Sequence, residues 1–370
     1  MKFKCQQQAL SKAITIVSKA ITNRTTIPIL KGILLQAENG QLTLSASDLE
    51  LSIETKIEVQ VEEEGSVVIS AKLFSDIIRK LPSAEVEIEE KENNMVVVSC
   101  QSSEFTIVGQ PSDEFPGAGD IEETHAIKIE KDLFKDMVRK TAFAASTDDS
   151  KGIIVGVLID IEETLIQLVA LDGYRMAITK ENVKNEEEKK IVIAARILNE
   201  INKVIQDSDS EEHPDMDIIL DQKRAMFLTG NTKIMLRMLE GKFIDFKNVL
   251  PKEYKTRVKV ERSQLSESIE RASLLARDGK NNLIRISINE ASMVVTSRSE
   301  EGNVREEIFI QCEGEPLEIG FNSKYLLDVL KVVDDDEICM EFGSSVSPCL
   351  IKPTEGEAYE YLILPVRISN

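Results

Sequence analysis

The chain has 370 residues, 42% of them hydrophobic, and a formal net charge of −20 at pH 7. This length exceeds one comfortable core and predicts two to three domains, and the composition is typical of a soluble globular protein. The longest apolar runs have the length of strands, which argues against membrane-spanning helices, and the net charge argues against nucleic-acid binding through the average surface.

The cysteines and the N-terminus predict the compartment. Five cysteines occur without CxxC spacing, and Met1-Lys2-Phe3-Lys4 is not followed by a signal-type apolar segment. These features predict reduced thiols in a cytoplasmic protein.

Residues 7–24 predict an amphipathic helix. Its apolar positions recur at helical spacing and are Leu10, Ala13, Ile14, Val17 and Ile21. Lys12 and Lys19 project from the opposite face, and the segment contains no acidic residue. Pro28 disfavours α geometry at Ile27, so we expect an extended run after the helix, then a turn at residues 38–40 and an alternating strand.

The same unit recurs twice along the chain. Long helices are predicted at 130–146 and 262–278, each followed by strand, turn and strand, and shorter helices at 71–81, 195–205 and 323–333. Matching positions lie about 125 residues apart, which indicates a domain-sized repeat. With linkers at 111–124 and 250–257, we predict domains at 1–124, 125–252 and 253–370. Two helices and about eight strands in each predict an α+β fold.

Charge is distributed unevenly between the helices and the remainder of the chain. The net charge is positive, between +1 and +3, over each of the helical segments 7–24, 71–81, 130–146, 194–205, 262–280 and 322–333, so the strands and loops carry the acidic excess. One explanation is that Lys and Arg are good helix formers. Glu shares that propensity, however, and residues 7–24 contain none. The alternative is a positive helical surface that faces a polyanion.

Residue patterns for catalysis are missing. The chain has no GxxxxGK[ST] loop, GxGxxG turn, HExxH pair or GxSxG elbow, and its two histidines, His125 and His213, lie in a predicted linker and an acidic loop. Without tryptophan and with 5% aromatic residues, a base-stacking platform is not expected either. We therefore predict no enzymatic activity, metal or cofactor.

Six runs of residues together point to one family: TNRTTIPILKGILL, VALDGYRMAI, LEGKFIDFKNVLP, IERASLLARDGKNN, FNSKYLLDVL and LILPVR. Their order and spacing make essentially the whole chain similar to the bacterial DNA polymerase III β subunits, the sliding clamps. The resemblance implies the DNA clamp fold in three tandem copies and a head-to-tail homodimer that closes into a ring. It implies a non-catalytic processivity factor that encircles duplex DNA and tethers the replicative polymerase, the clamp loader and repair proteins.

The resemblance also implies two kinds of site residue. The cations at positions that approach DNA in the family are Arg24, Lys72, Lys151 and Arg196. The positions that form a groove for partner peptides are Ile154, Leu171, Gly173, Tyr174, Arg175, Met176, Pro251, Asn322, Tyr325, Val346, Leu362, Leu364, Pro365, Val366 and Arg367. Without the resemblance, the alternative for each cation is an exposed basic residue with no role in binding. The alternative for each groove position is an ordinary core residue.

The chain departs from the family pattern at several positions. Leu171 stands where Thr is common, and Ile244 and Phe246 replace the usual Pro and Tyr before Pro251. Ser369 and Asn370 extend past the usual end, near the groove. Asp148 and Asp149 place acid beside Lys151, which weakens the expectation of a DNA contact there.

Two other functions stay open on the sequence. A monomeric repeat scaffold could bind peptide partners without enclosing DNA. An enzyme with an unfamiliar carboxylate site is more distant, because in a chain with 65 Asp and Glu most acidic pairs are solvated surface.

Overall fold

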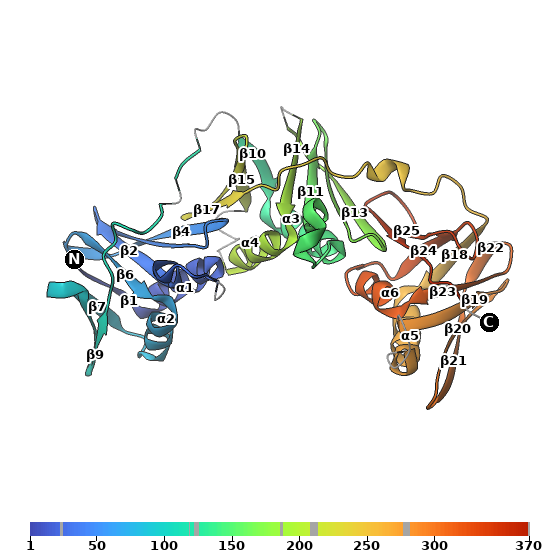
Figure 1. Cartoon of the computed structure of the whole chain (residues 1–370), viewed down its shortest axis with the longest axis horizontal. Helices are drawn as coiled ribbons and strands as arrows, with labels where there is room; N and C mark the ends of the chain where they lie inside the picture. Colours follow the sequence, from blue (N-terminus) through green and yellow to red (C-terminus); the bar gives the residue numbers. More distant parts are fainter. Residues whose placement is uncertain are drawn as a thin grey trace. The chain divides into compact units, whose positions relative to one another are not determined.

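The computed structural model describes residues 1–22, 25–117, 119–121, 126–185, 188–207, 214–276 and 282–368. The chain forms two compact units, one of Met1–Lys135 with Arg196–Met238 and one of Asp136–Ala195 with Leu239–Asn370 (Figure 1). Within the described residues, no helix is both long enough and apolar enough to cross a membrane.

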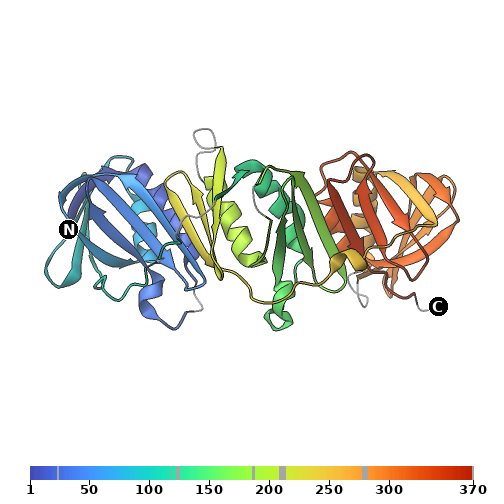
Figure 2. The ribbon, with the colours of Figure 1, turned by 90° about the horizontal axis from the view of Figure 1, so that it is seen from above.

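The first unit contains two antiparallel sheets. The five-stranded sheet has the order β5-β1-β7-β8-β9, and the eight-stranded sheet has the order β10-β15-β16-β17-β4-β3-β2-β6. Figure 2 shows the blue N-terminal strands next to the yellow strands of this second sheet. The strands are β1 (Lys2–Gln6), β2 (Gly32–Glu38), β3 (Gln41–Ser47), β4 (Leu51–Glu58), β5 (Gln60–Glu63), β6 (Gly65–Ser70), β7 (Glu85–Glu90), β8 (Met95–Cys100), β9 (Ser103–Val108), β10 (Ala126–Glu130), β15 (Asp215–Leu220), β16 (Arg224–Thr229) and β17 (Thr232–Arg237).

The second unit also contains two antiparallel sheets. The nine-stranded sheet has the order β14-β11-β12-β13-β26-β25-β24-β18-β22, and the four-stranded sheet has the order β21-β20-β19-β23. The strands are β11 (Gly156–Ile161), β12 (Leu165–Leu171), β13 (Arg175–Asn182), β14 (Lys189–Ala194), β18 (Thr256–Glu261), β19 (Leu283–Ile288), β20 (Ser292–Ser299), β21 (Gly302–Phe309), β22 (Gln311–Gly314), β23 (Leu317–Asn322), β24 (Glu337–Phe342), β25 (Cys349–Pro353) and β26 (Tyr359–Ile363).

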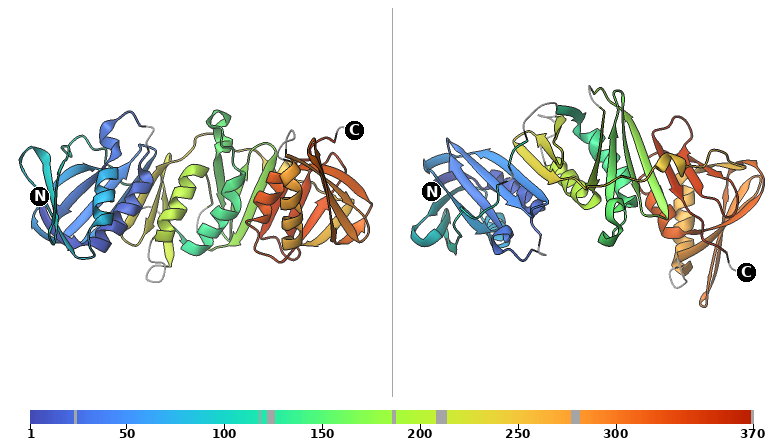
Figure 3. Two further views of the ribbon diagram at one scale, coloured as in Figure 1. Left: turned by 90° about the horizontal axis from the view of Figure 1, so that it is seen from below. Right: turned by 45° about the horizontal axis from the view of Figure 1, so that its top comes forward.

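All six predicted helices form. They are α1 (Gln7–Val17), α2 (Ala71–Lys80), α3 (Lys131–Thr141), α4 (Ala195–Asp207), α5 (Arg262–Ala276) and α6 (Ser323–Leu330). Two of them end earlier than predicted: α1 stops at Val17 and α3 at Thr141, and a short 3-10 segment follows each. The apolar stripe of α1 is buried against β3 and β4, and α1 packs beside α2, as α5 does beside α6 (Figure 3). Short 3-10 segments are η1 (Ser18–Ala20), η2 (Pro28–Lys31), η3 (Glu92–Asn94), η4 (Ala142–Ala144), η5 (Asp149–Val155) and η6 (Phe246–Asn248).

The hairpin after α1 was predicted with one error. The turn at Asn39-Gly40 forms, with positive φ at both residues. The run that begins at Pro28 is not extended throughout, however, because Pro28–Lys31 form the 3-10 segment η2 and β2 starts only at Gly32. Ile27 is extended, as a residue before proline should be, while proline itself suits the first position of a helical turn.

Two sheets continue across predicted domain boundaries. In the first unit, β4 pairs with β17, with Ser52 opposite Met235; we call this pairing the first junction. In the second unit, β13 pairs with β26, with Met176 opposite Leu362; we call this pairing the second junction. Both pairings are antiparallel. In each, the strand from the earlier part of the chain is the second strand of a repeated hairpin, β4 after β3 and β13 after β12.

Candidate functional site

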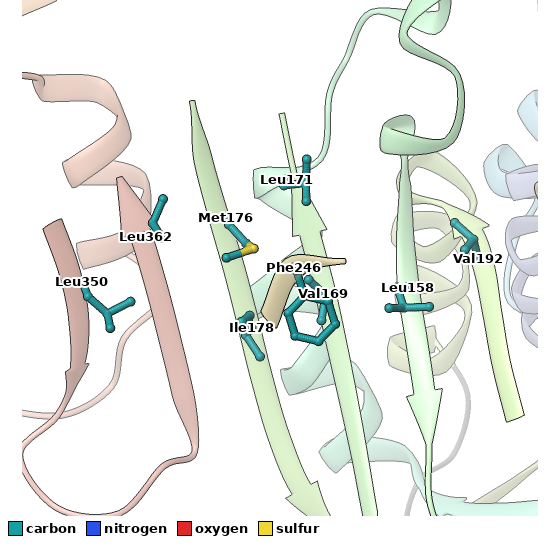
Figure 4. Close-up of a cluster of buried hydrophobic side chains, with 9 residues drawn as sticks. All are labelled: Leu158, Val169, Leu171, Met176, Ile178, Val192, Phe246, Leu350 and Leu362. Atoms are coloured by element: carbon teal, nitrogen blue, oxygen red, sulfur yellow. The ribbon is translucent and has the colours of Figure 1, made fainter. Parts of the chain in front are cut away.

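One face of the nine-stranded sheet carries an apolar cluster that crosses the second junction. Leu171, Met176 and Leu362 lie on the adjacent strands β12, β13 and β26, each less than 8% exposed. The buried cluster, drawn in Figure 4, consists of Leu158, Val169, Leu171, Met176, Ile178, Val192, Phe246, Leu350 and Leu362. Alternation places every second side chain of each strand on this face, so that neighbouring strands add to one continuous surface.

The segment between β17 and β18 covers part of this cluster. Phe246 of η6 is buried within it, and Leu239, Phe243 and Leu250 pack against its edge. Ile244 is 43% exposed, so of the two departures from the family pattern only the phenylalanine contributes to the core. Pro251 lies at a small cavity of about 120 Å³ that Leu350 also lines.

The turn between β12 and β13 is fixed by Asp172. Its carboxylate accepts hydrogen bonds from the backbone N–H groups of Tyr174 (2.8 Å) and Arg175 (3.0 Å). Gly173 has φ +93°, a left-handed conformation that glycine adopts without a Cβ penalty. Tyr174 is 62% exposed, and its ring stacks on that of Tyr325 with the centroids 6.3 Å apart.

Arg175 joins this turn to α6. Its guanidinium donates to Asp172 Oδ2 (3.0 Å), to Asp328 Oδ2 (2.6 Å) and to the carbonyl of Phe143 (2.9 Å). It also lies 4.8 Å from the ring centroid of Tyr325, a cation–π arrangement. With an 11% exposed side chain and these partners, Arg175 positions the turn and Tyr325 and is not a free cation.

Helix α6 and the C-terminal segment complete this edge. The Asn322 side chain accepts from the backbone N–H of Lys324 (3.0 Å) and caps α6, which carries Tyr325. Burial raises the pKa of Tyr325. On the C-terminal segment, Leu364 N donates to Tyr174 O (2.9 Å) and Val366 N to Gly320 O (2.8 Å), with Pro365 between them.

The structure brings most of the predicted groove residues of this unit into two sets. The apolar set within or against the buried cluster is Ile154, Leu171, Met176, Leu362 and Leu364, and the polar and aromatic set around the turn and α6 is Gly173, Tyr174, Arg175, Asn322 and Tyr325. Val346 (72% exposed) and Arg367 are exposed and lie outside the apolar cluster. Sequence reasoning missed Phe246, Leu350 and Leu158; the alternation within β11 and β25 was the available signal for the last two.

The predicted DNA-facing cations differ in their surroundings. Lys72 is exposed in the first turn of α2 and Lys151 is exposed in η5. Asp148 accepts hydrogen bonds from the backbone N–H and the hydroxyl of Ser150, which lower the pKa of Asp148, and this carboxylate lies beside Lys151. Arg24 lies outside the described residues.

Arg196 on α4 has acidic partners within the first unit. It donates to Glu50 Oε2 (2.8 Å) and to Asp48 Oδ2 (3.4 Å), and its side chain is 54% exposed. A phosphate contact at this position would therefore compete with two carboxylates. Helix cations elsewhere are also paired one turn away, for example Arg79 with Asp76 and Lys203 with Glu200.

Similarity to known proteins extends over nearly the whole chain. Family models of the DNA polymerase III beta subunit match it in three consecutive parts, the N-terminal domain at residues 1–119, the central domain at 128–245 and the C-terminal domain at 247–367. A beta sliding clamp of Bacillus subtilis is 37% identical over 99% of this chain and 100% of its own length.

Solved structures agree with these matches. A putative DNA polymerase III beta subunit from Eubacterium rectale superposes with a TM-score of 0.95 at 35% identity, with both chains fully covered. A sliding clamp from Pseudomonas aeruginosa, solved bound to griselimycin, gives a TM-score of 0.93 at 26% identity, also with full coverage of both chains.

Proposed function

The chain belongs to the DNA polymerase III beta subunit family, and from this premise we propose that two copies close into a ring that encircles duplex DNA. The ring acts as a sliding clamp: it is a non-catalytic accessory subunit of the polymerase holoenzyme that tethers the replicative polymerase, the clamp loader and repair proteins. The observation that carries this function is the match of three consecutive family domains in order along nearly the whole chain. The same matches confirm the predicted α+β clamp fold.

Ring closure is proposed between two edge strands, β9 and β21, each at the end of its sheet. Both carry exposed apolar side chains, Val108 (72%) on β9 and Phe309 (83%) on β21. Unpaired edges with exposed apolar residues favour pairing with another chain. In the hairpin repeat, β21 occupies the place of β4 and β13, and β9 occupies the place of β17 and β26.

The two junctions supply a register for this contact. Transferring the pairs Ser52–Met235 and Met176–Leu362 to the edge strands sets Asn303 opposite Thr106 of the second copy. The same register sets Val304 opposite Phe105 and Arg305 opposite Glu104. The last pair corresponds in the first junction to Glu54 and Lys233, whose charged atoms lie 3.9 Å apart. The contact is heterologous, and two of them close a ring.

Charge reversal tests this register. Arg305→Glu and Glu104→Arg should each lower the fraction of dimer in sedimentation, while the double variant should restore it. Glu307, which already pairs with Arg305 within the chain (2.8 Å), provides the matched control as Glu307→Gln. A single-chain mass for the unmodified protein at micromolar concentration would instead support the runner-up, a monomeric scaffold that binds peptides without enclosing DNA.

The second-junction surface is proposed as the peptide groove. Its aliphatic residues accept apolar anchors, and Tyr174, Tyr325 and the C-terminal segment offer aromatic and polar contacts beside them. Pro365 has no N–H, which leaves part of this edge open. Tyr325→Ala should abolish binding of a polymerase-derived peptide and leave the dimer intact. Leu274→Ala, on an exposed side chain of α5, is the control, and equal peptide affinity in both variants would refute the groove.

DNA contact is proposed through Arg24, Lys72, Lys151 and, more weakly because of its carboxylate partners, Arg196. Contacts of lysine and arginine with phosphate carry no sequence information and weaken with salt, which suits a ring that slides. After loading on nicked circular DNA, the complex should survive high salt until the DNA is linearised. Equal retention on unblocked linear DNA would contradict topological binding.

The domain limits of 1–124, 125–252 and 253–370 and a cytoplasmic location complete the proposal. At each junction one sheet continues from one predicted domain into the next. This supports neighbouring domains that pack against each other within a unit. Limited proteolysis should cut first within the predicted linkers, 111–124 and 250–257. Cleavage inside β4 or β13 would contradict these limits.

A further inference from the structure

A cavity of about 630 Å³ opens at the first junction, entirely within the first unit. Its volume falls within the range of ligand sites in proteins. Its lining consists of Ser47, Leu49, Glu50, Ser52, Pro116, Gly117, Asp221, Gln222, Lys223, Arg224, Met235, Leu236 and Arg237.

The cavity occupies the position in the first junction that the proposed groove occupies in the second. Ser52 and Met235 face each other across β4 and β17 as Met176 and Leu362 do across β13 and β26. The turn before β4 is also built alike, because Asp48 accepts from the backbone N–H groups of Glu50 (3.0 Å) and Leu51 (2.8 Å). The first-junction and second-junction surfaces therefore share a similar backbone arrangement and carry different side chains.

Leu49 is held in an unfavourable conformation at this cavity. Its φ is +76°, which costs a residue with a Cβ roughly 1–2 kcal/mol, and its side chain is 58% exposed. The corresponding residue of the second junction is Gly173, which adopts the same region freely. A leucine that is strained and also exposed gains little from folding, which singles out this position as a candidate contact for a ligand.

The charges of the lining favour an acidic ligand. Three cationic side chains, Lys223, Arg224 and Arg237, line the cavity against two carboxylates. Glu50 accepts from Arg196 (2.8 Å), which does not line the cavity. Asp221 accepts from Arg224 (2.8 Å), so these two lining groups offset each other and the cationic excess comes from Lys223 and Arg237. This cationic excess occurs in a chain of net charge −20.

We propose that the first-junction cavity binds a short acidic peptide segment of a partner protein, with one apolar side chain on Leu49 and its carboxylates on the cationic wall. This goes beyond the proposed function, which places partner peptides at the second junction only. The apolar anchor would contact Leu49, Pro116 and Met235, and Lys223 and Arg237 would bind the carboxylates.

Methionine-methyl NMR on the full chain separates the two surfaces, because Met235 lines the cavity and Met176 lies in the apolar cluster of the second junction. The probe is an acetylated and amidated pentapeptide with leucine between two pairs of aspartates. We expect it to shift the Met235 methyl signal in a saturable way and to leave Met176 unchanged. The same peptide with lysine in place of aspartate should give no saturable shift.

Leu49→Gly removes the proposed anchor and also relieves the backbone strain, so this variant is expected to fold. It should weaken binding of the aspartate peptide roughly tenfold. Tyr325→Ala, in the second unit, is the matched control and should leave this affinity unchanged. The proposal is wrong if Met235 does not respond at millimolar peptide, if the lysine peptide binds equally, or if Leu49→Gly binds as tightly as the parent chain.

Discussion

The two junctions share one strand register and differ in the side chains that this register displays. On the first, Ser47 and Ser52 face each other with their hydroxyls 2.7 Å apart, beside the charged pair of Glu54 and Lys233. On the second, Leu171, Met176 and Ile178 take the corresponding places and are buried in an apolar cluster. Backbone pairing therefore fixes where a surface lies, and a few exchanges decide whether it is polar or apolar.

The largest expected effect comes from giving the second junction the side chain of the first. Met176→Ser leaves a cavity in the apolar cluster, and we expect it to lower the free energy of unfolding by about 3 kcal/mol. The reverse exchange, Ser52→Met, adds a side chain at a half-buried position and should change it by less than 1 kcal/mol. Urea unfolding measures both, and similar losses in the two variants would remove the distinction between the junctions.

Arg175 provides the next test, because its counterpart in the first junction is the fully buried Leu51. Arg175→Ala leaves the carboxylates of Asp172 and Asp328 without their arginine partner, and we expect a loss of about 2 kcal/mol. Arg175→Lys should recover only part of this, because lysine lacks the planar fork of donors. A neutral effect of Arg175→Ala in thermal unfolding would show that the turn and α6 hold their positions unaided.

The turn residues should give a smaller difference of opposite sign. Gly173→Leu has space around the added Cβ but forces a positive φ on leucine, so we expect a loss of roughly 1 kcal/mol. Leu49→Gly should be neutral or stabilising by a few tenths of a kcal/mol, since relief of strain offsets the entropy of glycine. Destabilisation by Leu49→Gly comparable to that of Gly173→Leu would mean that Leu49 is an ordinary packing residue.

The smallest effect concerns pH at the first junction. Burial would raise the pKa of Asp221, but hydrogen bonds from the N–H groups of Lys223 and Arg224 and from the Arg224 side chain outweigh it and hold the pKa below the ordinary value of an aspartate. A lowered pKa stabilises the fold above the unfolded-state value and loses this contribution as pH falls through the folded-state value.

Between pH 5 and 3 the melting temperature of the parent chain should therefore fall slightly more than that of Asp221→Asn. Asp217→Asn, on the neighbouring strand β15, is the control. A steeper fall in Asp221→Asn than in the parent chain would contradict the assigned direction.

The helices and the threefold repeat were accessible from the sequence because each depends on local periodicity. The groove positions rest on a family motif and stay predictions. The 3-10 turn at Pro28–Lys31 was missed because proline disfavours helical geometry only at the residue before it, Ile27, whereas the prediction applied this effect to the residues after proline as well. Burial of Phe246 depends on a segment that folds back over the sheet, and the pairing of Arg196 with Glu50 joins residues 146 positions apart. Periodicity carries no information on such long-range contacts.

Disulfide trapping of the transferred register tests the central claim most directly. In this register Asn303 faces Thr106 of the second copy, and opposed residues of an antiparallel pair lie within disulfide distance. A chain with Asn303→Cys and Thr106→Cys should be loaded onto circular DNA in its reduced form and then oxidised. We expect it to form a covalent ring that stays on the circular DNA at high salt and leaves once the DNA is linearised. Failure to crosslink, with efficient crosslinking when Thr106→Cys is replaced by Val108→Cys, would contradict the shared register and with it the proposed ring.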